Sequence, residues 1–246
     1  MEIIINYKPY NKQKKFHNSK KKFRAFIGGL GSGKTLAGSI EAIRTMIKYP
    51  NTMGAILAPT YPLLRDSTIR TMLEWMPRKL IKSYNRTEQH LTLINGAECI
   101  FRPCDDINSI DRLRNIQLGW GWIDEASLTP EYVYRVIIGR LRDKKGPMNL
   151  WVTTTPKGFN WIWEKWVNKP TKNHYMVTSS SRENKYLPKD YVPMLQAEYT
   201  GVFAKQEIEG EFVGFEGLVY PDFSRNIHVK PMKHIIENGR IVGVDI

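Results

Sequence analysis

The sequence predicts an α/β fold: a doubly wound, mainly parallel sheet with helices on both faces, followed by a small C-terminal lid. Apolar runs recur at 23–27, 53–58, 118–123, 149–155 and 174–179, and stretches of helical spacing separate several of them. Several runs end in glycine, threonine or acidic residues, where open α/β sheets place ligands. With 246 residues and 41% hydrophobic content, the chain can form one large core domain of this class.

The first run leads into a glycine-rich turn that matches the pattern G-x-x-x-x-G-K-[ST]. Such a turn directs backbone N–H groups at phosphate oxygens, and its glycines remove the Cβ atoms that would block a close approach. Lys34 supplies a positive charge for the β- and γ-phosphates, and Thr35 supplies a hydroxyl for Mg²⁺. The sequence therefore predicts a triphosphate and metal site formed by Gly28, Gly29, Leu30, Gly31, Ser32, Gly33, Lys34 and Thr35.

The charge balance favours a polyanionic partner. Lys and Arg number 37 against 24 Asp and Glu, a formal net charge of +13. Nucleic acid is the usual partner of such a protein, although a basic face that only maintains solubility gives the same balance. We see no apolar run long enough for a membrane span and no signal peptide. Cys99 and Cys104 lack metal-ligand spacing, so we expect buried thiols in a reducing cytoplasm.

Gln13 stands in an aromatic and basic segment just before the first strand. Its amide offers both a donor and an acceptor, which makes it a candidate reader of the adenine edge, and the alternative is an exposed glutamine on a short basic helix. Residues 35–49 have apolar positions on one helical face, and strand 53–58 leads into a further basic helix. Asn95-Gly96 between two apolar runs predicts a hairpin over 91–103.

The strand 118–123 ends in Asp124 and Glu125, about 90 residues after the phosphate loop. A phosphate-loop enzyme needs one acid to hold Mg²⁺ and a second to orient and deprotonate the attacking water. Asp124 suits the first role and Glu125 the second. Arg114, and as second choice Arg112, could stabilise charge on the transferring phosphoryl group, or be surface arginines that form salt bridges.

The remaining chain predicts a helix over 130–145, a strand over 149–155 and a strand over 174–179. Thr153, Thr154 and Thr155 end the first of these strands and could sense the γ-phosphate, or be an ordinary β-rich run. A tryptophan cluster at 161–166 is expected to be core rather than a base-stacking surface. The domains expected are a core over 1–179, a polar lid or linker over 180–238, and the first strand of a truncated further domain over 239–246.

Together these segments resemble the ATPase half of the large terminase subunit, the motor that packs DNA into the procapsids of tailed bacteriophages. The resemblance rests on Gln13, GGLGSGKT at 28–35, DRLRN before WIDEA, TTTPKG at 153–158, and the late GEF and GLVYPDF stretches before IVGVDI. It implies a P-loop NTPase of the ASCE type that uses ATP and Mg²⁺, with Lys34 and Glu125 as catalytic residues. It also implies an arginine finger, matching Arg114 or Arg112, that acts in cis or on a neighbouring subunit.

The same resemblance implies further properties of the longer protein. The family's second domain is a nuclease of the RNase H type, of which Asp245 would be the first metal ligand, so we expect no nuclease activity from this chain. The implied partners are double-stranded viral DNA, the portal protein, the small terminase subunit and other copies in a ring, in the host cytoplasm. Two alternatives stay open: a helicase-like translocase, and a nucleotide-gated assembly module without useful turnover.

Overall fold

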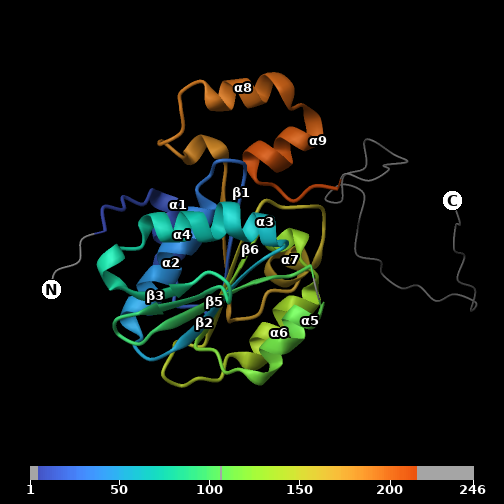
Figure 1. The fold of residues 1–246 in the computed structure, drawn as a ribbon. Helices are drawn as coiled ribbons and strands as arrows, with labels where there is room; N and C mark the ends of the chain where they lie inside the picture. The colour runs from blue at the N-terminus through green and yellow to red at the C-terminus, as the bar shows by residue number, and fades with distance from the viewer. Residues whose placement is uncertain (1–4, 106, 215–246) are drawn as a thin grey trace, which may run out of the picture. The chain divides into compact units, whose positions relative to one another are not determined.

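The computed structural model describes residues 5–105 and 107–214, and these contain an eight-stranded sheet (Figure 1). The strand order is β3-β4-β5-β2-β6-β7-β1-β8. Neighbouring strands are parallel except at β4, which is antiparallel to both β3 and β5. The predicted doubly wound, mainly parallel sheet is therefore confirmed. The strands are β1 (Phe23–Gly28), β2 (Met53–Ala58), β3 (Ile81–Asn85), β4 (His90–Leu93), β5 (Glu98–Pro103), β6 (Trp120–Asp124), β7 (Asn149–Thr154) and β8 (His174–Ser179).

The helix predicted over 35–49 is observed one residue earlier at each end, as Lys34–Lys48. The helix predicted over 130–145 ends at Arg140, because Leu141 leaves the helix to pair with Leu118 as an isolated parallel bridge. The π-helical turns Leu64–Ile69, Glu164–Asn168 and Lys205–Glu209 extend α3, α7 and α9. The α-helices are α1 (Asn11–Asn18), α2 (Lys34–Lys48), α3 (Tyr61–Leu63), α4 (Arg70–Trp75), α5 (Ile107–Arg112), α6 (Glu131–Arg140), α7 (Trp161–Trp163), α8 (Tyr191–Glu198) and α9 (Gly201–Ala204).

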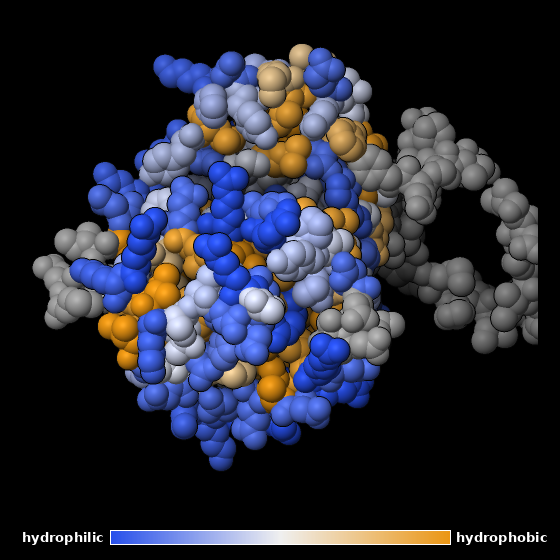
Figure 2. Space-filling view, viewed as in Figure 1, coloured by the Kyte–Doolittle hydropathy of each residue, from blue (hydrophilic) through white to orange (hydrophobic). Residues whose placement is uncertain are grey.

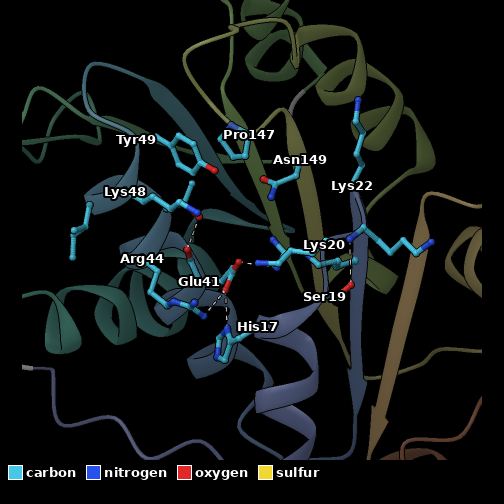
Figure 3. A pocket seen from close by; sticks show the side chains of 14 residues that line it. His17, Ser19, Lys20, Lys22, Glu41, Arg44, Lys48, Tyr49, Pro147 and Asn149 are labelled. Carbon is cyan, nitrogen blue, oxygen red and sulfur yellow. Dashed lines mark hydrogen bonds and ion pairs between the residues drawn. The ribbon is translucent and has the colours of Figure 1, made fainter.

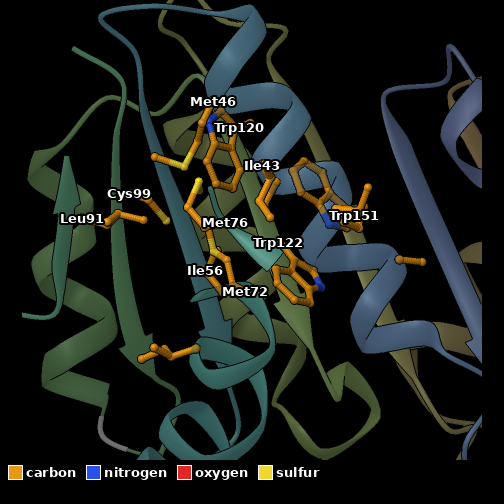
Figure 4. Packing of buried hydrophobic residues seen from close by; sticks show 14 of the residues in the cluster. Ile43, Met46, Ile56, Met72, Met76, Leu91, Cys99, Trp120, Trp122 and Trp151 are labelled. Atoms are coloured by element: carbon orange, nitrogen blue, oxygen red, sulfur yellow. The ribbon is translucent and has the colours of Figure 1, made fainter. Parts of the chain in front are cut away.

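Each face of the sheet carries its own hydrophobic core. On one face α1, α2 and α4 cover the three tryptophans that β6 and β7 contribute (Figure 4). On the other face α5, α6 and α7 pack. Trp120 stacks on Trp151 with ring centroids 5.3 Å apart, and both are fully buried. A Cβ on Gly54 would lie 1.9 Å from the Trp120 ring, so only glycine lets β2 pass this side chain.

A buried ion-pair network lies at the α2 side of the sheet. Glu41 of α2 accepts hydrogen bonds from Arg24 Nη1 and His17 Nδ1, each at 2.7 Å. Arg24 lies over the rings of Phe16 and Trp151, at 5.3 and 5.5 Å from their centroids. Burial alone would raise the pKa of Glu41, but the hydrogen bond from His17 and the charge of Arg24 outweigh it and lower the pKa to about 2.

Residues 180–209, the described part of the predicted lid or linker and called the lid below, lie above the carboxyl end of β1 (Figure 1). They belong to the same compact unit as the sheet, which extends to Gly214. Figure 2 shows hydrophilic side chains over much of the face in view and hydrophobic residues on the lid, where Met194 is 56% exposed. The rest of the predicted lid or linker, 215–238, and the predicted strand 239–246 with Asp245 lie outside the described residues.

Two smaller expectations can be compared with the described residues. Cys99 and Cys104 are buried and form no disulfide, as predicted for buried thiols. A search of the described helices for one with the length and apolarity to cross a bilayer finds none.

Candidate nucleotide site

The phosphate loop connects β1 to α2 in a backbone conformation that requires glycine. Gly31 and Gly33 have φ angles of +68° and +74°, in the left-handed region that other residues rarely adopt. A Cβ on Gly29 would lie 2.3 Å from the carbonyl oxygen of Ile208. The glycine spacing of the motif is therefore set partly by the loop's own turn and partly by the lid that packs on it.

Four successive carbonyls of the phosphate loop each accept a hydrogen bond from a side chain outside the loop. Two donors come from the lid and two from the segment at α1. The pairs are Ser181 Oγ to Leu30 O (2.5 Å), Asn184 Nδ2 to Gly31 O (2.6 Å), Tyr10 Oη to Ser32 O (2.6 Å) and Gln13 Nε2 to Gly33 O (3.1 Å). In a trans peptide the carbonyl and the following N–H point in opposite directions. The anchored carbonyls therefore fix the direction of the N–H groups that follow them.

Gln13 is buried, with 3% of its surface exposed, so the alternative of an exposed glutamine is wrong. Its Oε1 accepts a hydrogen bond from the Tyr10 N–H while its Nε2 donates to Gly33. Both ends of the amide therefore act within the protein, one at the start of α1 and the other at the phosphate loop. The role of Gln13 as a reader of the adenine edge stays a prediction.

Asp124 lies at the carboxyl end of β6 and is nearly fully buried. Its carboxylate accepts hydrogen bonds from three threonine hydroxyls: Thr153 at 2.6 Å, Thr68 at 2.8 Å and Thr35 at 3.3 Å. Burial, and next the negative charge of Glu125, raise the pKa of Asp124 to about 6. The Thr35 hydroxyl and the Asp124 carboxylate are the hard oxygen donors that Mg²⁺ prefers. This pair fits the predicted metal site, with phosphate oxygens and water to complete the coordination.

Glu125 follows β6 with φ 48° and ψ 44°, a left-handed conformation unusual for a residue with a side chain. Such strained backbone is concentrated at functional sites. Glu125 Oε1 lies 3.6 Å from Lys34 Nζ, and Oε2 accepts the Thr155 N–H at 3.4 Å. Asp124 and Glu125 line a cavity of about 240 Å³ with residues of the loop and the lid. The structure thus brings the predicted base to the predicted phosphate-binding lysine.

Strand β7 lies between β1 and β6, so its end separates the phosphate loop from the acidic pair. The Thr153 hydroxyl donates to Asp124, and the Thr154 hydroxyl donates to Glu125 at 3.5 Å. Beyond the strand, Lys157 forms an ion pair of 2.5 Å with Glu207, a buried lid residue. One strand end therefore touches both acids and, three residues later, the lid.

Sequence reasoning missed several residues of this site, because none belongs to a motif. Thr68 lies on the π-helical turn after β2, and such turns are frequent at functional sites. Its place after a strand of the parallel sheet is the one signal that could have found it. The other missed residues are Tyr10, Ser181, Asn184 and Glu207.

Arg112 is the last residue of helix α5, and Arg114 lies in the short turn that follows, on the opposite face of the sheet from α2. Arg114 is exposed, and its guanidinium donates to Asp111 at 2.9 Å and to the Tyr132 hydroxyl at 2.6 Å. Arg112 is exposed and lines a groove beside β5. The structure does not bring either arginine to Lys34 and Glu125 of the same chain.

The chain is similar in sequence to known phage proteins. A family described as phage terminase large subunit matches residues 20–208. The large terminase subunit of Thermus virus P23-45 is 28% identical over 178 residues, which are 65% of this chain and 36% of that protein.

Solved structures show the same fold. The large terminase of a thermophilic bacteriophage, in complex with ADP, has a TM-score of 0.76 and 24% identity over 90% of this chain and 58% of that one. The ATPase domain of the Thermus phage P74-26 large terminase has a TM-score of 0.68 and 22% identity, and 85% of this chain covers 96% of it. This chain thus spans about a third of the Thermus virus relative and three fifths of the chain in the ADP complex. The match over residues 20–208, together with the phosphate loop and acidic pair, places the chain in the phage terminase large subunit family.

Proposed function

We propose that this chain is a Mg²⁺-dependent ATPase that drives double-stranded DNA into a procapsid. The observation that carries the proposal is the position of Glu125, whose carboxylate lies 3.6 Å from Lys34 and in the same cavity as Asp124. A strand-end carboxylate beside the phosphate-binding lysine is the arrangement that hydrolysis of a γ-phosphate requires. The ADP complex of the thermophilic phage relative supports nucleotide binding by this chain.

Each step of the proposed ATP hydrolysis is assigned to residues of this chain. Lys34 and the N–H groups of the loop hold the β- and γ-phosphates, while Thr35 and Asp124 would hold Mg²⁺, which neutralises charge that develops on the phosphate oxygens. Glu125 orients a water molecule and takes its proton as the water oxygen attacks the γ-phosphorus. The bond from that phosphorus to the leaving oxygen of ADP breaks, and ADP and phosphate result.

We further propose that Thr153, Thr154 and Thr155 couple hydrolysis to movement. Their hydroxyl and N–H groups contact both acids, so a change in the charge around Asp124 or Glu125 changes their hydrogen bonds. The Lys157–Glu207 ion pair then connects this strand end to the lid. Loss or gain of the γ-phosphate can in this way alter the lid position.

Measurement of phosphate release from MgATP tests the proposal. We expect steady turnover by the wild-type chain that stops when EDTA removes the metal and returns when Mg²⁺ is added in excess. Lys34→Ala, purified in the same way, is the control for contaminating ATPases, because these also require Mg²⁺. Binding of ATP without turnover would support the nucleotide-gated assembly module instead, and would overturn the ATPase proposal.

The partners follow from family membership and belong to the same proposal: double-stranded DNA, a portal protein, a small terminase subunit and further copies of this chain in a ring, in the cytoplasm of a bacterial host. Asp245 would act as a metal ligand of the nuclease domain only in a longer chain, and we propose that residues 1–246 alone do not cut DNA. Gln13 is proposed as an adenine contact only if nucleotide binding frees its amide from Gly33.

The position of Arg114 leads us to propose that it acts on a neighbouring subunit, because it lies on the far face of the sheet from its own α2. Arg114→Ala and Lys34→Ala should each be inactive alone. A mixture should regain activity, since some interfaces pair an intact Arg114 with an intact Lys34. Phosphate release against mixing ratio measures this, and a mixture as inactive as its parts contradicts action in trans. Arg135→Ala, which removes an exposed arginine of α6 outside the candidate pair, is the matched control for loss of a surface charge.

A further inference from the structure

A basic cavity of about 420 Å³ lies at the amino ends of β1 and β7, beside the last turns of α2 (Figure 3). The candidate nucleotide site lies at the carboxyl ends of these strands. The cavity therefore opens at the opposite ends of the same strands. Glu41 is the one carboxylate among its lining residues. The lysines and arginines that line it are Lys20, Lys21, Lys22, Arg24, Arg44 and Lys48.

The floor of the cavity is fixed and already positive. Figure 3 shows Glu41 between Arg44 and His17, and the carboxylate oxygens lie 2.7 Å from Arg24 and 3.5 Å from Arg44. One carboxylate therefore faces two guanidinium groups. Arg24 is 2% exposed, and its Nε and Nη2 have no hydrogen-bond partner among the described residues. The buried pair of Arg24 and Glu41 is thus neutral, and the excess positive charge comes from Arg44, whose side chain is 54% exposed.

Three lysines at the rim add to this excess. Lys20 and Lys22 are exposed, and neither they nor Lys48 forms an ion pair within 5–105 and 107–214. Lys48 Nζ lies 5.4 Å from the centre of the Tyr49 ring. Like charges around one concave surface repel each other and raise the local concentration of anions. Ammonium groups on flexible stems suit the oxygens of a phosphate, which they can contact from several sides.

The positive surface continues beyond this cavity. A neighbouring depression shares Ser19, Lys20 and Lys21 with it and adds Lys14 and Lys15 of α1, without an acidic residue in its lining. A surface that extends over two concavities fits a row of phosphates better than a single small anion. It also favours the regular charge of duplex DNA, about one per 1.7 Å of axis, over a compact acidic patch on a protein.

We propose that this cavity binds backbone phosphates of duplex DNA, at the edge of the sheet opposite the nucleotide site. The inference rests on the proposed function for the identity of the polyanion. The contacts to DNA and the hydrolysis of ATP then occupy opposite ends of the same strands. Movement between β1 and β7 at one end is transmitted along both strands to the other.

The test neutralises the rim while the buried floor stays intact. The combined variant Lys20→Gln, Lys22→Gln, Lys48→Gln is compared with Lys185→Gln, Lys189→Gln, Lys205→Gln, which removes the same charge from the exposed surface of the lid. Binding of a labelled duplex is measured by fluorescence anisotropy over a range of salt concentrations. We expect the rim variant to reduce the slope of log affinity against log salt by about 2 to 3, because each lost phosphate contact removes about 0.9.

The controls separate this proposal from the function on which it rests. Both variants should keep wild-type melting temperatures and wild-type ATP hydrolysis without DNA, since none of the six lysines lies in the nucleotide site. The lid variant should keep most of the salt slope.

Equal slopes for the rim variant and the wild type would overturn the cavity as a DNA site and point to an acidic protein or another anion. If the rim substitutions abolish binding of inorganic phosphate but leave the affinity for the duplex and its salt slope unchanged, the cavity takes the free ion, which also overturns the proposal. A wild-type chain that does not bind DNA would overturn the DNA part of the proposed function as well.

Discussion

The variant Glu125→Gln should lose ATP hydrolysis while it retains ATP binding. The amide keeps the size of the side chain and its hydrogen bond from the Thr155 N–H, but it cannot take a proton from water. General base catalysis typically contributes about 10²- to 10⁴-fold to a rate, so we expect kcat for phosphate release to fall within that range. Binding of a fluorescent ATP analogue should stay within a few-fold of wild type, because the loop and Lys34 remain intact.

Glu131→Gln is the matched control for Glu125→Gln, since Glu131 pairs with Arg135 and Lys165 on the surface of α6. Its kcat should equal that of the wild type. If Glu125→Gln turned over ATP at the wild-type rate, another group would have to be the base. The strained backbone at Glu125 would then need another explanation.

The largest effect on stability is expected for Glu41→Gln. Glu41 compensates the buried Arg24, and removal of one partner of a buried ion pair typically costs about 3–5 kcal/mol. Chemical denaturation should show a loss of this size. Glu131→Gln again serves as control, because a surface ion pair contributes about 0–1 kcal/mol. A loss for Glu41→Gln as small as that of the control would contradict the interpretation that the network holds α2 to β1.

The pKa of Glu41 gives this contribution a defined pH dependence. Its folded value of about 2 lies below the ordinary value of 4.5, so the unfolded chain binds the proton more readily than the folded one. The stabilisation is fully present above pH 4.5 and is lost as the pH falls toward 2. The unfolding free energy of the wild type should therefore fall in this window more steeply than that of Glu41→Gln.

The sequence predicted the central part of the fold well, because its strands are buried on both sides and read as continuous apolar runs. Strand 53–58 is such a strand and has its predicted bounds. Strand 174–179 also has its predicted bounds, although it lies at the edge of the sheet and is mostly half-buried. Strand β3 was missed, since Ile81–Asn85 lies at the other edge and has only half-buried and exposed residues. The end of α6 was misplaced because a long-range pairing, Leu118 with Leu141, stops the helix.

The site shows the same division between local and long-range information. The phosphate loop and the acidic pair have fixed spacings that reflect the chemistry, and the structure brings Lys34, Thr35, Asp124 and Glu125 together. Residues that only support them have no spacing of their own. Asn184 reaches the loop across 153 positions of sequence, and Glu207 pairs with Lys157 across 50. Contacts of this kind depend on how the lid folds back, which no local pattern encodes.

The four anchored carbonyls of the phosphate loop make it sensitive to mechanical load. Two are held by Ser181 and Asn184 of the lid, and two by Tyr10 and Gln13 at α1. A pull on the lid would first strain the bonds to Leu30 and Gly31, the residues that shape the phosphate cradle. Because such coupling is reciprocal, a nucleotide that tightens the cradle also resists displacement of the lid. In a motor working against the pressure of packed DNA, force on the lid would then set how long the nucleotide stays bound.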